Sequence, residues 1–266
     1  MNNLHRELAP ISSAAWEQIE EEAARTLRRY LGARKVVDLH GPGGFDLNAI
    51  GTGHLDQVAP VVDGVNTSRR IVNPLVELRV PFQLSRSAID DVTRGSQDSD
   101  WQPLKDAARK IASAEDRMIF DGYTDAAIKG ILPNSSNGAV TLPGDAGDYP
   151  QAVARAVSQL RLAGVNGPYA LVLGTDAFTA ATGGNEDGYP IAKHLERILD
   201  TEVIWSEGLT GGLVVTTRGG DFDLYLGQDI SIGYSSHDAD SVSLYLQETL
   251  TFQMQTAEAS VVLRHD

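Results

Sequence analysis

Apolar residues near the start of the chain recur at the spacing of one helix face. These positions are Trp16, Ile19, Ala23, Leu27, Tyr30 and Leu31. Glutamate and arginine side chains fill the opposite face, Ser12 or Ser13 can cap the first turn, and Gly32 can end the helix. The pattern predicts an amphipathic helix, whose apolar face is by default part of the core and alternatively a groove for a partner.

Alternation of apolar and polar residues predicts two strands. In residues 76–84 the even positions are apolar, which is typical of a half-buried strand. A longer alternation follows late in the chain, at Val242, Leu244, Leu246, Leu250, Phe252 and Met254. At ~3.3 Å per residue this strand could span roughly 40 Å, which favours an extended or interlocked architecture over a compact enzyme.

Weaker patterns predict the remaining elements. Asp100 can cap a long helix with Leu104, Ala108, Ile111, Met118 and Ile119 on one side. A second helix is expected from about residue 150 to Gly164, and Pro190 can open a short one. Apolar runs predict strands at 35–39, 169–173, 203–205, 213–216 and 222–226. Helices and strands do not alternate regularly, so the predicted fold class is α+β.

Residues 47–72 are rich in Gly, Asn, Asp and Pro and show little helical periodicity. They contain too few large apolar residues to bury a core of their own. The composition predicts an extended loop. We expect its strands to pair with a neighbouring subunit, because unpaired strand edges favour association.

The composition is that of an ordinary globular protein, with 266 residues, 42% hydrophobic and 22% charged. The net charge of −14 disfavours duplex nucleic acid as a partner, because phosphate binding needs Lys and Arg. The chain has no cysteine, which excludes disulfides and thiolate metal sites. Neither a signal-peptide pattern nor a run of about 18 apolar residues occurs, so we expect a cytoplasmic protein without a membrane partner.

Common catalytic motifs are absent from the sequence. Gly41-Pro42-Gly43-Gly44 lacks the third glycine of a dinucleotide fingerprint, and no phosphate-binding loop, nucleophile elbow or zinc-protease motif occurs. His237-Asp238-Ala239-Asp240 could place three ligands near a metal, but a polar turn before the long strand explains the same residues more simply. The residues alone predict an α+β protein with an oligomeric role and without a catalytic site, a metal or a cofactor.

Short motifs follow one another along nearly the whole chain. The earlier ones are Leu4, Arg6, Ala9-Pro10, Trp16, Gly32, Arg34, Val36-Val37-Asp38, Pro74-Leu75, Glu77-Leu78-Arg79, Glu115-Asp116 and Gly167-Pro168-Tyr169. The most specific ones come at the end, at Arg218-Gly219-Gly220-Asp221-Phe222, Gly227-Gln228-Asp229-Ile230-Ser231-Ile232-Gly233-Tyr234 and Glu248-Thr249 with Thr251-Phe252. Taken in this order, the set resembles the encapsulin family of shell proteins.

The resemblance implies the fold of tailed-phage major capsid proteins, which have a peripheral domain, an axial domain and an extended loop. Residues 100–120 would form the spine helix of the peripheral domain. The expected division is 1–46 for a helix on the inner wall and the start of the peripheral domain, 47–72 for the extended loop, 73–149 for the peripheral domain, 150–225 for mainly the axial domain, and 226–266 for the return to the peripheral domain.

The resemblance also implies a function without catalysis, a self-assembling icosahedral shell of about sixty copies or a multiple. Such a cytoplasmic nanocompartment encloses cargo enzymes that dock through a C-terminal targeting peptide, and its pores control the access of small molecules. A dye-decolorising haem peroxidase is the first expected cargo and a ferritin-like protein the second. An enzyme and a DNA-packaging prophage capsid are the rival hypotheses, and the acidic net charge argues against the capsid.

Two sites follow from the resemblance. In relatives the first helix lies beside the docking groove, so Leu27, Leu31, Val36 and Ile230 are predicted to supply apolar pockets, while Arg34 and Asp38 fix polar groups of the peptide. For each residue singly, a pure core role stays open. Asn185, Glu186 and Asp187 are predicted to line a five-fold pore, with an ordinary solvated turn as the alternative. Some relatives bind a flavin through an aromatic residue where this chain has Ser87, so no flavin is expected.

Overall fold

The longest strand, β15 (Ser241–Met254), lies at the centre of a five-stranded sheet. The structure is a computed structural model that describes residues 3–186 and 188–265. β4 (Val76–Ser85) runs antiparallel along one edge of β15. The other edge pairs with β14 (Ser231–His237) and then β13 (Phe222–Leu226), and β1 (Asp38–His40) follows β13 in parallel. The two strands predicted by alternation are therefore confirmed, and they pair with each other.

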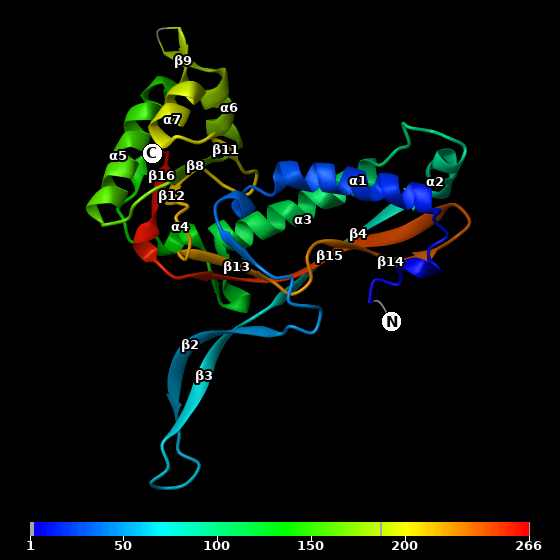
Figure 1. Ribbon diagram of the computed structural model, residues 1–266, viewed down its shortest axis with the longest axis horizontal. Coiled ribbons are helices and arrows are strands. Elements are labelled where there is room, and N and C mark those ends of the chain that lie inside the picture. The colour runs from blue at the N-terminus through cyan, green and yellow to red at the C-terminus, as the bar shows by residue number, and fades with distance from the viewer. Residues whose placement is uncertain (1–2, 187, 266) are drawn as a thin grey trace.

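Two long helices lie side by side against this sheet, α1 (Ser13–Tyr30) and α3 (Gln102–Phe120), with the short α2 (Arg86–Thr93) near one end (Figure 1). Ser12 caps α1 by accepting a hydrogen bond from the Ala15 N–H, and the Asp100 side chain accepts one from the Gln102 N–H at the start of α3. The apolar stripes of both helices meet in one core cluster, which confirms both predicted helices. None of the helices in the described residues is long and apolar enough to cross a membrane.

A second sheet forms the other unit of the fold. Its strand order is β11 (Ile204–Trp205), β8 (Tyr169–Leu173), β12 (Gly212–Thr216), β16 (Ser260–Arg264) and β7 (Val140–Thr141). The helices α5 (Tyr149–Leu162), α6 (Thr175–Gly183) and α7 (Ile191–Leu199) pack beside it (Figure 1). Every residue of β8 is buried, as its purely apolar run predicted.

A long hairpin projects from the first sheet and away from both units (Figure 1). It consists of β2 (Ala49–Val58) and β3 (Thr67–Pro74), which pair only with each other, and neither strand has a buried residue. Val61 and Val62 at the connecting turn are 81% and 60% exposed. The hairpin coincides with the predicted extended loop at 47–72.

Short elements complete the chain. They are η1 (Arg6–Leu8), η2 (Ala33–Lys35), β5 (Gly122–Tyr123), η3 (Thr124–Ala126), β6 (Ile128–Lys129), α4 (Ile131–Asn134), η4 (Ala146–Asp148), β9 (Asn185–Glu186), β10 (Tyr189–Pro190) and η5 (Ala257–Ala259).

The structure differs from the sequence-based expectation at several elements. The strand expected at 35–39 begins only at Asp38, because Ala33–Lys35 forms the 3-10 turn η2. The patterns did not predict α2, β14 or β16. β13 pairs in the first sheet and β16 in the second, so the segments 150–225 and 226–266 both contribute to both sheets.

Candidate functional site

Two glutamates occupy positions where their elements otherwise carry apolar side chains. Glu248 lies between Leu246 and Leu250 on the apolar face of β15, and Glu115 lies one helical turn from Ile111 on α3. Both glutamate side chains are 0% exposed. Burying an ionised carboxylate is costly unless it is paired and hydrogen-bonded, so both residues need partners inside the fold.

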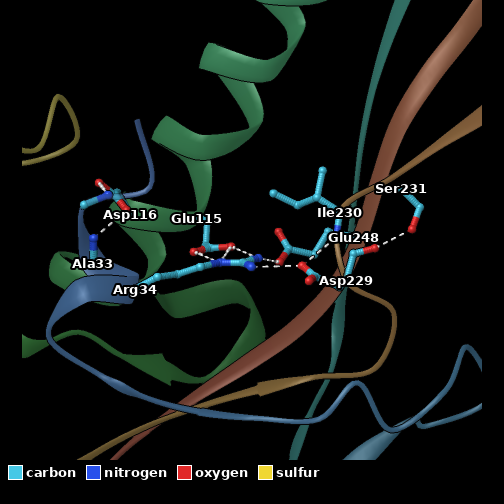
Figure 2. A network of polar contacts seen from close by, with 9 residues as sticks. Ala33, Arg34, Glu115, Asp116, Asp229, Ile230, Ser231 and Glu248 are labelled. Atoms are coloured by element: carbon cyan, nitrogen blue, oxygen red, sulfur yellow. Dashed lines mark hydrogen bonds and ion pairs between the residues drawn. The ribbon is translucent and has the colours of Figure 1, made fainter. Parts of the chain in front are cut away.

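Arg34 supplies the partner for both glutamates. The residue lies on η2, directly after α1, and its guanidinium reaches between α3 and β15 (Figure 2). Its Nε donates to both oxygens of Glu115 at 2.9 and 3.0 Å, and its Nη2 donates to Glu115 Oε2 at 2.7 Å and to Glu248 Oε1 at 2.6 Å. The bidentate contact fixes the plane of the guanidinium as well as its position.

The same guanidinium also anchors the loop that precedes β14. Arg34 Nη1 donates to Asp229 Oδ1 at 2.9 Å, and this oxygen also accepts the backbone N–H of Ile230 at 2.8 Å. Ser231 Oγ donates to the Asp229 carbonyl at 2.7 Å, and the Gln228 N–H donates to Thr249 Oγ1 at 2.7 Å. Gln228 and Asp229 are therefore tied to β15 and to Arg34, and Ser231 closes a turn on Asp229.

Asp116, next to Glu115, holds the chain where α1 ends. Its carboxylate accepts the backbone N–H groups of Gly32 and Ala33 at 3.1 and 2.9 Å and the hydroxyl of Ser206 at 2.5 Å. A Cβ at Gly32 would lie 2.7 Å from the Ser206 Cβ and 2.9 Å from the Trp205 carbonyl oxygen, so only glycine fits. These contacts determine where η2, and with it Arg34, begins.

Charge in this cluster is unbalanced, because three carboxyl groups surround one guanidinium. Burial raises the pKa of Glu248 well above its ordinary value, and the charge of Glu115 and a hydrogen bond with it raise that pKa further. Oε2 of Glu248 is buried and has no hydrogen-bond partner within the described residues, which also favours the neutral acid. Burial by itself would lower the pKa of Arg34, but the hydrogen bond and charge of Glu115 raise it, so the guanidinium stays charged. Burial also raises the pKa of Asp116 to about 6, although its three hydrogen bonds lower it.

This arrangement suits holding elements together better than chemistry on a ligand. The groups nearest to the cluster are carboxyls and one guanidinium, and the chain has no cysteine that could act as a nucleophile. In the residues that the structure describes, no group of three or more His, Cys, Asp or Glu side chains is placed to hold a metal ion. His237 to Asp240 form the polar turn between β14 and β15, where Asp238 Oδ1 accepts the N–H groups of Asp240 and Ser241.

The predicted docking residues fall into two groups. Leu27 and Ile230 are half-buried and pack against the same core cluster, although they are far apart in sequence. Val36 and Asp38 instead line a separate cavity of about 160 Å³, together with Phe222 from β13. Val36 is only 4% exposed, so the structure favours the core role that the sequence had left open for it. Leu31, also half-buried, follows the last residue of α1.

Two contacts within the subunit were not anticipated for the predicted polar docking residues. Every nitrogen of the Arg34 guanidinium already donates to a carboxylate of its own subunit. The Asp38 carboxylate accepts the backbone N–H of Gly220. Sequence reasoning also missed Asp229 and Glu248 as members of this site. The available signal was the break in the β15 alternation, where a glutamate stands at an apolar position.

The strand β9, which carries Asn185 and Glu186 of the three predicted pore residues, lies at the far end of the second unit, beyond α6 and α7 (Figure 1). Asn185 is exposed on β9, which pairs with β10 to make a short hairpin. Glu186 is the second residue of β9, and Asp187 lies outside the described residues. Pro190 is the N-cap of α7, as predicted.

Sequence comparison identifies close relatives. Residues 1–251 match the profile of a protein family described as the encapsulating protein for peroxidase. The chain is 57% identical over 263 residues to the type 1 encapsulin shell protein of Rhodococcus erythropolis, and the match covers 99% of this chain and 100% of that protein.

Two solved structures share the fold at low sequence identity. The virus-like particle from Pyrococcus furiosus matches with a TM-score of 0.64 at 16% identity, over 94% of this chain and 99% of that one. The capsid of a Myoviridae phage matches with a TM-score of 0.53 at 11% identity, over 88% of this chain and 91% of that one. At these identities the likeness concerns the fold alone, and it confirms the tailed-phage capsid fold.

Proposed function

This chain belongs to the encapsulin shell-protein family, and on that premise we propose that it docks cargo proteins beside α1 and admits small solutes through pores lined by its β9–β10 hairpins. As a member of this family the chain assembles into a capsid-like icosahedral shell. We propose a shell of about sixty copies or a multiple, located in the cytoplasm. Particle size from electron microscopy of the purified shell tests that number.

One observation carries the docking proposal. Leu27 on α1 and Ile230 in the loop before β14 are half-buried apolar residues that pack against one core cluster. Large apolar side chains that stay partly exposed on the same core cluster suit the apolar anchors of a peptide. We place the cargo peptide along these two residues and Leu31, and we leave Val36 in the core role that its burial favours.

The proposed cargo is a haem peroxidase of the dye-decolorising class, and a ferritin-like protein is the second candidate. The family described as the encapsulating protein for peroxidase supports the first choice. Purification of the native particle followed by mass spectrometry identifies the enclosed protein. Neither candidate is supported if the shell yields an unrelated enzyme.

The proposed docking site at Leu27, Leu31 and Ile230 can be tested with a probe, a fluorescent protein fused to the C-terminal tail of a dye-decolorising haem peroxidase. The measurement is the amount of probe that each shell encloses. We expect Leu27→Gln to assemble and to load roughly tenfold less probe, because loss of one apolar anchor weakens binding by about 1–2 kcal/mol. Arg28→Gln is the matched control, since Arg28 is the exposed neighbour of Leu27 on α1. Full loading of Leu27→Gln shells would contradict the proposed docking site.

We also propose that the shell has no catalytic activity of its own and encloses no duplex nucleic acid. The full-length relative is a shell protein, and the net charge of −14 disfavours phosphate binding. The ratio of absorbance at 260 and 280 nm of purified particles tests the second point. A ratio typical of nucleic acid would favour the rival hypothesis of a DNA-packaging capsid.

A further inference from the structure

We propose that Arg34, Glu115 and Glu248 form a positioning triad, which holds the Asp229–Ile230 corner where the cargo peptide docks but does not touch the peptide itself. The inference rests on the proposed docking function. It assigns Arg34 a different role from the direct peptide contact that the sequence suggested, and it gives a role to two buried glutamates that docking alone leaves unexplained.

The hydrogen bonds lead from the triad to the docking residue in two steps. Arg34 is fixed from two directions, by Glu115 on α3 and by Glu248 on β15. It then donates to Asp229 Oδ1, and the same oxygen receives the N–H of Ile230 (Figure 2). The direction of the Asp229 carboxylate therefore decides where the backbone of Ile230 lies, and Arg34 decides the direction of that carboxylate.

The geometry of the two glutamates implies that one of them carries a proton. Glu115 Oε2 and Glu248 Oε1 accept from the same nitrogen, Arg34 Nη2, at 2.7 and 2.6 Å. Two carboxyl groups this close, both buried, repel each other strongly unless one of them is protonated. The raised pKa of Glu248 agrees with this arrangement.

The charged groups that face Glu248 come from three directions. They are Arg34 from η2, Glu115 from α3 and Asp229 from the loop, whereas β4 presents the apolar Leu78 opposite Glu248. With Glu248 neutral, one guanidinium faces two carboxylates. Loss of this proton as pH rises adds a third negative charge, which competes with Asp229 for Arg34. We therefore expect the loop to loosen and docking to weaken as pH rises.

A purely structural triad predicts a different result. Residues that only stabilise the subunit would change assembly or melting temperature but would not make cargo binding depend on pH. Glu248→Gln separates the two roles, because glutamine keeps the volume and can donate to Glu115 but cannot lose the proton. Arg34→Lys keeps the charge, but a point charge cannot reproduce the planar fork that reaches three carboxyl groups.

The experiment uses assembled shells of the full chain. Binding of the fluorescent probe with the peroxidase tail is measured over a series of pH values from neutral upward, and hydrogen exchange of the amides at 228–232 is followed in empty shells. Wild-type shells should bind the probe several-fold more weakly as pH rises through the pKa of Glu248, and Glu248→Gln shells should bind it equally over the whole series. Arg34→Lys should weaken binding by about tenfold at pH 7, the order of a lost charged hydrogen bond, and should speed exchange in the loop. Arg109→Lys is the matched control, because Arg109 makes a bidentate ion pair with Glu207 on the surface of α3.

The two readouts separate this inference from the docking proposal. If Arg34→Lys leaves loop exchange unchanged, or if Glu248→Gln keeps the wild-type pH dependence, the triad does not position the corner and the inference is overturned. If loop exchange speeds up while probe binding stays intact, the triad holds the loop but the loop does not dock cargo, which overturns both proposals. If Arg34→Lys fails to assemble, the pH dependence of probe binding in Glu248→Gln shells still tests the inference.

Discussion

Asp116 illustrates how a single buried carboxylate fixes the backbone between α1 and η2. It accepts three hydrogen bonds from Gly32, Ala33 and Ser206, and burial still raises its pKa to about 6. Its folded-state pKa therefore lies above the ordinary value of 3.8. For such a group, stability falls as pH rises through the window between the two values, here from about pH 4 to about pH 6.

Ser206→Ala should destabilise the subunit more at pH 8 than at pH 5. The hydroxyl stabilises the ionised carboxylate, so its removal raises the pKa of Asp116 further and extends the window of lost stability upward. We expect a loss of about 1–3 kcal/mol at pH 8 and a smaller one at pH 5, where Asp116 is largely protonated. Thermal unfolding at both pH values measures the difference. Ser243→Ala, which removes an exposed hydrogen bond with Gln83, is the control, and an equal loss at both pH values for Ser206→Ala would contradict the argument.

At the level of residues, the resemblance named Leu27 and Ile230 together as parts of a docking groove, which remains a prediction. The structure shows that both pack against one core cluster, which helical or strand periodicity could not show. The partners of Arg34 come from positions 81, 195 and 214 residues away, and no local pattern connects such positions. The pattern did contain one clue, a glutamate at an apolar position of a long strand. Only the contact with Arg34, which the fold brings between α3 and β15, explains how this glutamate is tolerated.

Elements with strong periodicity were predicted, and elements made by long-range pairing were not. α1, α3, β4 and β15 each carry a clear apolar face that appears in the sequence. β14 contains serines, a glycine and a histidine, and it is a strand because β15 pairs with it. β16 is a short apolar run that pairs antiparallel with its neighbour β12 in the second sheet. Its position depends on a partner some fifty residues away, so the sequence alone could not place it.

The β2–β3 hairpin is an element without a core of its own. Its strands pair only with each other, and Leu55, Val61, Val62 and Val65 are exposed within the subunit. Isolated two-stranded hairpins are marginally stable in water, so this one needs further contacts. In a shell, the available contacts are with neighbouring subunits.

Val61→Ser with Val62→Ser should prevent or weaken assembly while leaving the subunit folded. Both side chains are largely exposed, so the substitution removes little that stabilises the subunit itself. Deletion of residues 58–67 should act more strongly and leave monomers or small oligomers. Size-exclusion chromatography measures assembly, and circular dichroism measures secondary structure. Leu162→Ser, at an apolar position that is 86% exposed on α5, is the control and should assemble normally. Intact shells from the deletion variant would refute the role of the hairpin.

At the scale of the whole molecule, hydrophobic periodicity predicts neither the order of the strands in the two sheets nor the assembly of subunits. The α+β class followed from the pattern, whereas the capsid fold followed only from the ordered motifs and is confirmed by the solved structures. Closed symmetry changes what a single residue contributes, because a side chain near a symmetry axis is repeated in every subunit and forms a ring of identical side chains. We propose that the β9–β10 hairpin at the end of the second unit is such a place.

We predict that exchanging the charge of this hairpin changes which solutes enter the shell. If the hairpins meet at a five-fold axis, Glu186 and Asp187 form rings of carboxylates that attract cations and repel small anions, and salt weakens the effect. Glu186→Lys with Asp187→Lys reverses the sign of these rings. An enclosed enzyme is assayed at low salt with anionic and cationic substrates of matched size, and the variant should turn over the anionic substrate several-fold faster relative to the cationic one. Added salt should reduce the difference, because ions screen the charge over about 10 Å at 0.1 M. Glu196→Lys, on α7 of the same unit, is the control for a charge reversal outside the hairpin, and it makes half of the total charge change of the double variant. An unchanged substrate ratio in the double variant would place the main route of entry elsewhere in the shell.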